Sequence, residues 1–231
     1  MKKLMIVFAA ALCFAVSFSS FASAQEKAVS APKNLFAERD LNQWDFHCAE
    51  KDVKVSDVYS FNDDGVLTCK GKPNGYIATK SVYKNFKASV EFAWPEGVEP
   101  SNSGIFLRIN AQPQGNFLPR GIEVQLKNGS VGDLWAFHGM RIGGPKNRHT
   151  DNPNSSLAGA MSGVSKIEEA EKQPGQWNQL DILVVDSLVV VSVNGKIVNW
   201  TNEAETTPGK LGLQSEGGPV KFRNCVVTEL K

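Results

Sequence analysis

Three polar side chains occupy alternate positions in two strand-like segments and could bind a polyhydroxylated ligand. Arg108 lies in the run 105–109, and Glu123 and Gln125 lie in the run 122–126. If the apolar residues of both runs face the core, a period of two places these three side chains on the opposite face. A guanidinium, a carboxylate and an amide supply the donors and acceptors that sugar hydroxyls need. The alternative is a cross-strand ion pair on a solvated sheet face.

A second carboxylate could complete an acid/base pair. Glu216 follows Gln214 and Ser215, immediately before the turn signal at residues 217–218. Glu123 and Glu216 could act as acid and base if burial, or the charge of one carboxylate, raised the pKa of the other.

Further candidates follow the Glu123 segment closely. Alternation across residues 132–138 predicts Asp133, Trp135 and Phe137 on one face of a strand and His138 on the other. Trp135 could stack on a sugar ring or pack in a core, and His138 could transfer a proton or have a structural role only.

Several catalytic signatures are absent from the sequence. It contains no G-x-S-x-G, H-E-x-x-H, P-loop, paired C-x-x-C or G-x-G-x-x-G motif opening a helix. His47, His138 and His149 do not have zinc-ligand spacing. A serine hydrolase, a zinc protease and a nucleotide-dependent enzyme are therefore disfavoured. A divalent cation such as calcium stays open, although no compact Asp/Asn loop specifies one.

The elements that must position these residues are predicted to be strands. Period-two or β-branched patterns cover residues 86–94, 105–109, 122–126, 180–185, 188–193, 196–200, 211–214 and 220–230. Asn194-Gly195 predicts a type I′ hairpin, and only residues 165–172 favour a short helical turn. The sequence predicts an all-β fold, an antiparallel sandwich or jelly roll. The Gly- and Pro-rich segment Gly139 to Gly175 resists strand assignment and is expected to be functional or disordered.

Composition excludes some partners. The 231 residues include 25 Lys and Arg against 24 Asp and Glu, giving a formal net charge of +1, with no block of like charges. Binding to nucleic acid or to an anionic bilayer surface requires clustered basic residues. Both kinds of partner are therefore disfavoured. The composition is compatible with an uncharged glycoside or oligosaccharide, which binds without long-range electrostatic attraction.

The first residues resemble a secretory signal. Lys2 and Lys3 precede an apolar run over residues 4–16, and the triplet 22–24 reads A-S-A. This pattern predicts a signal peptide at 1–24 cleaved after Ala24, too short to span a bilayer stably. Acylation of Cys13 in a lipoprotein is the less favoured alternative, because Cys13 lies inside the apolar stretch.

Cleavage would leave residues 25–231 as a single periplasmic or secreted domain. This domain retains Cys48, Cys69 and Cys225. In an oxidising compartment one pair could form a disulfide, and three pairings are open. The alternative is that all three are small buried hydrophobic residues.

Six motifs, in order along the chain, resemble the 3-keto-disaccharide hydrolase family, formerly a domain of unknown function. They are NLF-x3-DL-x2-W at 34–44, NSGIFLR at 102–108, EVQ at 123–125, GQWN at 175–178, VNG at 193–195, and GLQ, GGPV and FRN within 212–224. The resemblance extends over nearly all of residues 25–231. It implies a fold of the concanavalin-like lectin and glucanase type, with a groove on a concave sheet.

The resemblance also implies site residues. The groove would be lined at Asn102, Arg108, Glu123 and Gln125, with Asp133 and the segment from Gln214 to Glu216 nearby.

The family's associated chemistry is cleavage of glycosides whose C3 hydroxyl has been oxidised to a ketone. The ketone acidifies the C2 proton, so the C1 group leaves by elimination and water adds afterwards. In this chain we expect Glu123 as base, Arg108 or a bound cation as electrophile, and His138 or Glu216 as proton donor. The alternatives are a non-catalytic lectin-like module that uses Trp135 or Trp94 as a platform, and a conventional glycoside hydrolase.

Overall fold

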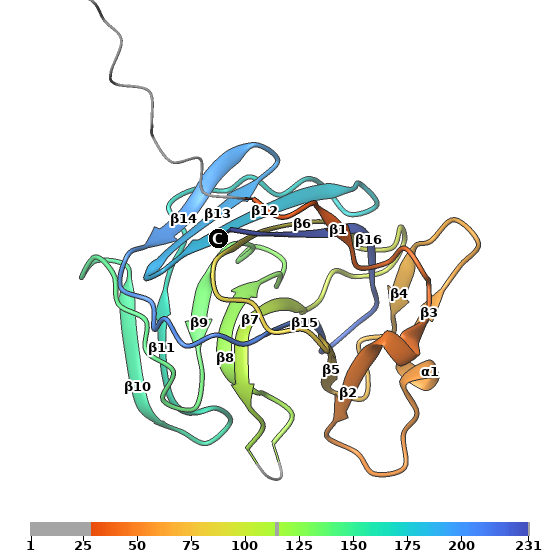
Figure 1. Cartoon of the computed structure of the whole chain (residues 1–231), viewed down its shortest axis with the longest axis horizontal. Helices are drawn as coiled ribbons and strands as arrows, with labels where there is room; N and C mark the ends of the chain where they lie inside the picture. Colours follow the sequence, from red (N-terminus) through yellow and green to blue (C-terminus); the bar gives the residue numbers. More distant parts are fainter. Residues whose placement is uncertain (1–28, 114–115, 231) are drawn as a thin grey trace, which may run out of the picture.

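The structure, a computed structural model, describes residues 29–113 and 116–230, which form two packed antiparallel sheets of eight strands each (Figure 1). The predicted signal peptide and Cys13 lie outside the described residues. The predicted all-β sandwich is confirmed. The two helical elements of the described chain are the 3-10 turn Leu41–Gln43 and the four-residue α1 (Val55–Val58). No helix among these residues has the length and apolar character needed to cross a membrane.

The back sheet, uppermost in Figure 1, contains the C-terminal strand. Its hydrogen-bonded order is β14 (Lys196–Thr201), β13 (Leu188–Val193), β12 (Asn178–Val185), β6 (Phe86–Ala93), β16 (Val220–Glu229), β4 (Leu67–Cys69) and β3 (Tyr59–Phe61), with β1 (Lys33–Asn34) paired to β16. The predicted hairpin between β13 and β14 is confirmed, since Asn194 and Gly195 both have positive φ, 51° and 81°.

The front sheet carries the candidate functional residues. Its order is β10 (His149–Ser155), β11 (Gly159–Val164), β9 (Leu134–Ala136), β8 (Arg120–Gln125), β7 (Gly104–Ala111), β15 (Lys210–Ser215), β5 (Gly75–Thr79) and β2 (Trp44–Cys48).

The main core fills the space between the two sheets, and alternation places it there. Inward residues such as Leu180, Ile182 and Val184 of β12 are buried, whereas Asp181 between them is exposed. A second apolar cluster lies on the other face of the front sheet. It contains Tyr76, Ala78, Phe106, Ile109, Leu118, Phe137 and Ala158, with Phe117, Trp135 and Met161 packed against it. The front sheet is therefore apolar on both faces, and its outer face is partly covered by loops.

Two predictions about the segment Gly139 to Gly175 are wrong. It contains the antiparallel pair β10 and β11, in register from His149 opposite Val164. Sequence patterns missed β10 because this edge strand is polar, exposed and contains Pro153. The helical turn predicted at 165–172 is also absent, and the backbone N–H groups of Ser165 and Ile167 donate to backbone oxygens of other segments, those of Arg148 and Val198.

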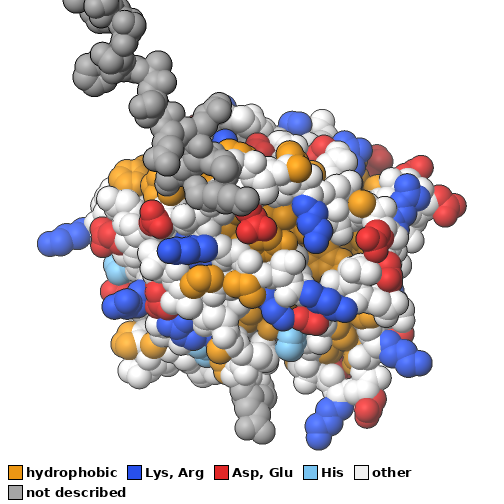
Figure 2. All heavy atoms as spheres, in the orientation of Figure 1, with side chains coloured by type: hydrophobic (Ala, Val, Ile, Leu, Met, Phe, Trp, Pro, Cys, Tyr) orange, Lys and Arg blue, Asp and Glu red, His pale blue; other side chains and the backbone are white. Residues whose placement is uncertain are grey.

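The three cysteines are free, with Cys69 and Cys225 buried and Cys48 partly exposed. The structure therefore contains no disulfide between any two of these three residues. On the surface seen in Figure 2, acidic and basic side chains are interspersed, in keeping with the near-zero net charge.

Candidate functional site

Strand pairing places Glu123 on the outer face of the front sheet. Glu123 of β8 lies directly opposite Phe106 of β7 and Trp135 of β9. Direct cross-strand partners project from the same face, and both aromatic residues belong to the outer cluster. The neighbours Ile122 and Val124 point into the main core. The predicted placement of Glu123 away from the main core is therefore confirmed.

A cavity of about 160 Å³ opens over Glu123. Its polar wall is made of Asn102, Glu123, Gln125, Gln214 and Glu216. Its apolar wall is made of Leu118, Trp135, Phe137, Leu157, Ala158 and Met161. Six of the nine predicted site residues thus line one cavity, although they come from strands far apart in the sequence.

Two glycines shape the space around the key side chains. A Cβ on Gly104 would lie 2.0 Å from Glu123 Oε1, so only glycine at this position leaves room for the carboxyl group. A Cβ on Gly163 would lie 2.5 Å from the ring carbons Cε3 and Cζ3 of Trp135, so the indole packs against bare backbone of β11. The positions of the Glu123 carboxyl and the Trp135 ring therefore both require glycine in a neighbouring strand.

The two carboxyls have different electrostatic environments. Glu123 is 2% exposed, and burial raises its pKa well above the ordinary carboxyl value; the charge of Glu216 raises it further. Burial also raises the pKa of the half-buried Glu216, but Asn102, Lys127 and Gln214 oppose that rise. The Gln214 amide likewise lowers the pKa of Glu123 in part. The pKa of Glu123 is thus raised further than that of Glu216, so Glu216 is the carboxyl that ionises more readily.

Several polar atoms at this cavity lack partners. Oδ1 of Asn102, Oε1 of Glu123 and both amide atoms of Gln214 are buried without a hydrogen bond of normal geometry in the described chain. Buried polar groups are nearly always hydrogen-bonded in folded proteins. Four such atoms around one cavity indicate a site for a polar ligand with both donors and acceptors.

Arg108 does not join this group, and its predicted position is wrong. It has a positive φ of 55°, and the pairing of β7 slips on both sides of it. This irregularity moves Arg108 off the face that Phe106 presents. Its guanidinium is fully buried and donates to backbone oxygens of Lys84 (3.2 Å), Asp186 (2.6 Å) and Glu205.

Asp133 and His138 also lie outside the cavity wall. Asp133 Oδ1 accepts a hydrogen bond of 2.7 Å from the Lys166 backbone. His138 sits next to the cavity residues Phe137 and Ala158, and its backbone N–H donates to the Ala158 oxygen (2.8 Å). Its Nε2 is buried without a partner, and burial lowers its pKa. The structure thus supports a structural role for Asp133 and places His138 beside the cavity rather than in it.

The described residues gather no group of three or more His, Cys, Asp or Glu side chains suited to a metal ion. Two carboxyls, those of Glu123 and Glu216, line the cavity itself.

The sequence indicates Trp135 and Phe137 but not the rest of the apolar wall, which comes from loops and from β11. Leu157, in the turn between β10 and β11, is 50% exposed at the cavity. Asn116 Nδ2 donates to its backbone oxygen (2.6 Å).

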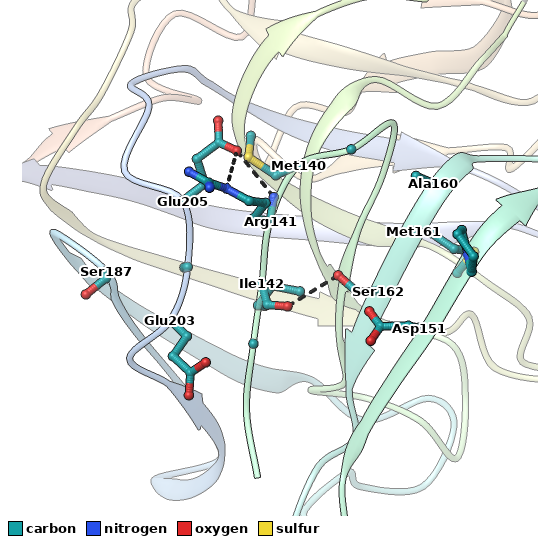
Figure 3. Close-up of a pocket in the computed structure, with 14 residues that line it drawn as sticks. Met140, Arg141, Ile142, Asp151, Ala160, Met161, Ser162, Ser187, Glu203 and Glu205 are labelled. Carbon is teal, nitrogen blue, oxygen red and sulfur yellow. Dashed lines mark hydrogen bonds and ion pairs between the residues drawn. The ribbon is translucent and has the colours of Figure 1, made fainter. Parts of the chain in front are cut away.

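A larger hollow of about 660 Å³ lies behind the hairpin of β10 and β11 (Figure 3). Arg120 forms an ion pair of 2.9 Å with Glu205, one of the carboxylates that line it. Its other carboxylates, Asp151 and Glu203, are exposed to solvent. The hollow therefore lacks the buried, unpartnered polar groups that mark the smaller cavity, which is the better candidate site.

Solved structures with similar folds include carbohydrate-active and carbohydrate-binding proteins. A candidate glycosyl hydrolase from Parabacteroides distasonis ATCC 8503 is 21% identical, with a TM-score of 0.60 over 87% of this chain and 94% of that one. A LamA variant from Zobellia galactanivorans, in complex with laminaritriose and laminaritetraose, is 12% identical, with a TM-score of 0.57 over 87% and 98%. The carbohydrate binding module CBM66 from Bacillus subtilis is 11% identical, with a TM-score of 0.57 over 81% and 95%. At these identities the likeness establishes the fold.

A comparison with curated proteins gives no match. The model of the 3-keto-alpha-glucoside-1,2-lyase-like domain matches residues 31–228, which include every strand that lines the cavity. The chain therefore belongs to the 3-keto-alpha-glucoside-1,2-lyase-like domain family.

Proposed function

We propose that this protein cleaves glycosides whose C3 hydroxyl has been oxidised to a ketone, in the cavity over Glu123. The observation that carries the proposal is the pair of carboxyls, Glu123 and Glu216, in one cavity, where burial raises the pKa of Glu123 more than that of Glu216. Membership of the 3-keto-alpha-glucoside-1,2-lyase-like family supports this choice of substrate.

The protonation states favour a different division of roles from the one expected from sequence. A base must be ionised before it can accept a proton, and Glu216 is the carboxyl that ionises more readily. A proton donor must hold its proton near neutral pH, which the burial of Glu123 favours. We therefore assign Glu216 as the base for the C2 proton and Glu123 as the acid for the departing C1 oxygen.

The reaction then balances in two stages. Glu216 takes the C2 proton, the electron pair of that C–H bond forms an enolate with the C3 ketone, and collapse of the enolate breaks the C1–O bond. The departing oxygen takes the Glu123 proton, leaving a C1–C2 double bond conjugated with the ketone. Water then adds to C1 and returns a proton to Glu123, while C2 recovers a proton from Glu216. The net result is hydrolysis, with both carboxyls restored.

The cavity matches one sugar ring in size and chemistry. At about 30 Å³ per water molecule in the liquid, its volume corresponds to roughly five waters. The amides and carboxyls can meet ring hydroxyls, and the half-buried Trp135 offers an apolar surface for ring C–H groups. The cavity wall contains no Lys or Arg, which favours a neutral sugar over an anionic one.

Leaving-group dependence tests these roles. We expect turnover of a 3-keto-glucoside and no turnover of an unmodified disaccharide. Glu123→Gln should abolish cleavage of an alkyl 3-keto-glucoside but retain activity on the p-nitrophenyl compound, whose leaving oxygen needs little protonation. Glu216→Gln should lose both activities, because C2 keeps its proton. Turnover of the unmodified disaccharide would instead identify a conventional glycosidase, and full activity of Glu123→Gln on the alkyl substrate would refute its role.

A non-catalytic carbohydrate-binding module is the second candidate, favoured by the aromatic wall at Trp135 and by the fold shared with CBM66. A glycan array combined with product analysis separates the two functions. Binding without turnover of any 3-keto substrate would support the module.

We also propose that the protein is exported to the periplasm or secreted, with cleavage after Ala24. The support is the sequence pattern of residues 1–24. Intact mass and N-terminal sequencing of protein recovered from the exporting cell test this; retention of residues 1–24 would contradict it.

A further inference from the structure

The proposed reaction needs a hydrogen-bond donor for the enolate oxygen, and the residue expected from sequence to provide it is elsewhere. Arg108 is committed to three backbone oxygens away from the cavity. None of the residues lining the cavity is a Lys or an Arg. A neutral donor in the wall must therefore stabilise the negative charge that develops on the C3 oxygen.

Gln214 is held firmly at this position. It lies in β15 opposite Tyr76 of β5 and is 0% exposed. Its backbone oxygen accepts a hydrogen bond of 2.8 Å from Ser103 Oγ. A side chain on a strand paired along both edges needs little reorganisation when charge develops beside it.

The Gln214 amide lies beside both carboxyls and lowers the pKa of each of them. Neither Nε2 nor Oε1 has a partner of normal geometry in the described chain, although both are buried. Leaving a buried donor or acceptor without a partner destabilises the folded protein. An amide without a hydrogen bond of normal geometry can pair both of its atoms with a ligand that has an acceptor next to a donor, which is the arrangement of a ketone beside a ring hydroxyl.

We propose that Gln214 is a catalytic residue that binds the C3 ketone: Nε2–H donates to the C3 oxygen, and Oε1 accepts from an adjacent ring hydroxyl. This inference rests on the proposed function. When Glu216 removes the C2 proton, the electron pair of the C–H bond moves into the C2–C3 bond and the negative charge moves to the C3 oxygen. The Nε2–H bond is strongest at that moment, so it stabilises the enolate more than the ground state.

The enolisation step can be measured apart from cleavage. The 3-keto form of 1,5-anhydroglucitol lacks a C1 leaving group, so in deuterium oxide the enzyme can only exchange its C2 proton, a change that NMR detects. Gln214→Met keeps the side chain's approximate size but removes both amide atoms. We expect exchange to fall about 100- to 1,000-fold, the effect of losing one oxyanion donor. Gln173→Met, at an exposed position outside the cavity, is the matched control and should exchange at the wild-type rate.

The outcomes separate this inference from the proposed function. If the wild-type protein neither exchanges the C2 proton nor cleaves 3-keto-glucosides, the proposed function fails. If the wild type is active and Gln214→Met exchanges within about threefold of it, only the role of Gln214 is overturned. If Gln214→Met fails to fold, Gln214→Asn replaces it as the test variant. Its amide is one carbon too short to reach the C3 oxygen, so we expect the same fall in the exchange rate.

Discussion

Arg108 provides a sharp test of the structure, because sequence and structure assign it opposite roles. Its guanidinium donates to the backbone oxygens of Lys84, Asp186 and Glu205, which belong to three separate loops around the sandwich. Replacing it with Met leaves these three oxygens without a donor. At about 1 to 3 kcal/mol for each unsatisfied group the upper range is about 9 kcal/mol. The cost of burying the guanidinium itself offsets part of this, so we expect a net loss of about 3 to 5 kcal/mol.

Thermal unfolding measures that loss. For a domain of this size each kcal/mol corresponds to a change of about 2 to 4 °C in melting temperature, so Arg108→Met should melt roughly 6 to 20 °C below the wild type. Arg108→Lys retains a positive charge but not the planar guanidinium, so its melting temperature should lie between those of Arg108→Met and the wild type. Turnover per folded molecule, measured well below the melting temperature, should be unchanged in both variants. A melting temperature equal to the wild type's, with turnover lost, would refute the reasoning and return Arg108 to the active site.

The cavity supports three more predictions. Because folding raises the pKa of Glu123, the free energy of unfolding should fall by about 1.4 kcal/mol for each pH unit between the ordinary carboxyl pKa and the higher pKa in the folded protein. Glu123→Gln should remove this contribution and leave that of Glu216, so its melting temperature relative to the wild type should rise as pH rises; a constant difference from about pH 4 to 8 would contradict this. Gly104→Ala should displace the Glu123 carboxyl and lower kcat by about 100-fold, with about 1 to 3 kcal/mol lost in denaturant unfolding; full turnover would show that the carboxyl is not needed there. Asn102→Ala removes a group that lowers the Glu216 pKa, so the acid limb of the profile of kcat/KM against pH should move to higher pH, and an unmoved limb would argue against Glu216 as base.

Much of the polar site could be predicted because strand alternation is a strong constraint. The buried Ile122 and Val124 determine which face Glu123 and its strand neighbours occupy. Gln214 and Glu216 were predicted from the family motif at 212–224, and both line the same cavity as Glu123.

Arg108 shows where alternation fails. A single irregular residue in a strand changes which face the following residues occupy, and no property of the run 105–109 indicates that irregularity. Ile109 demonstrates the effect, because it packs in the outer cluster although alternation predicted the main core.

The apolar wall could not be predicted for another reason. Leu157 reaches the cavity through a turn between two strands, and β10 is too polar to be recognised as a strand from its composition. Such contacts depend on how the hairpin folds back over the sheet, which a local pattern does not encode.

In the proposed mechanism, cleavage depends on removal of the C2 proton in the cavity of Glu123 and Glu216. The most direct measurement compares turnover of p-nitrophenyl 3-keto-glucoside carrying hydrogen or deuterium at C2, with product analysis by mass spectrometry and an enzyme-free control. We predict that the deuterated substrate reacts more slowly. Its product should lose the C2 deuterium, because the deuteron on Glu216 exchanges with solvent before C2 is protonated again. Equal rates with the deuterium retained at C2 would contradict the mechanism and indicate direct displacement at C1 instead.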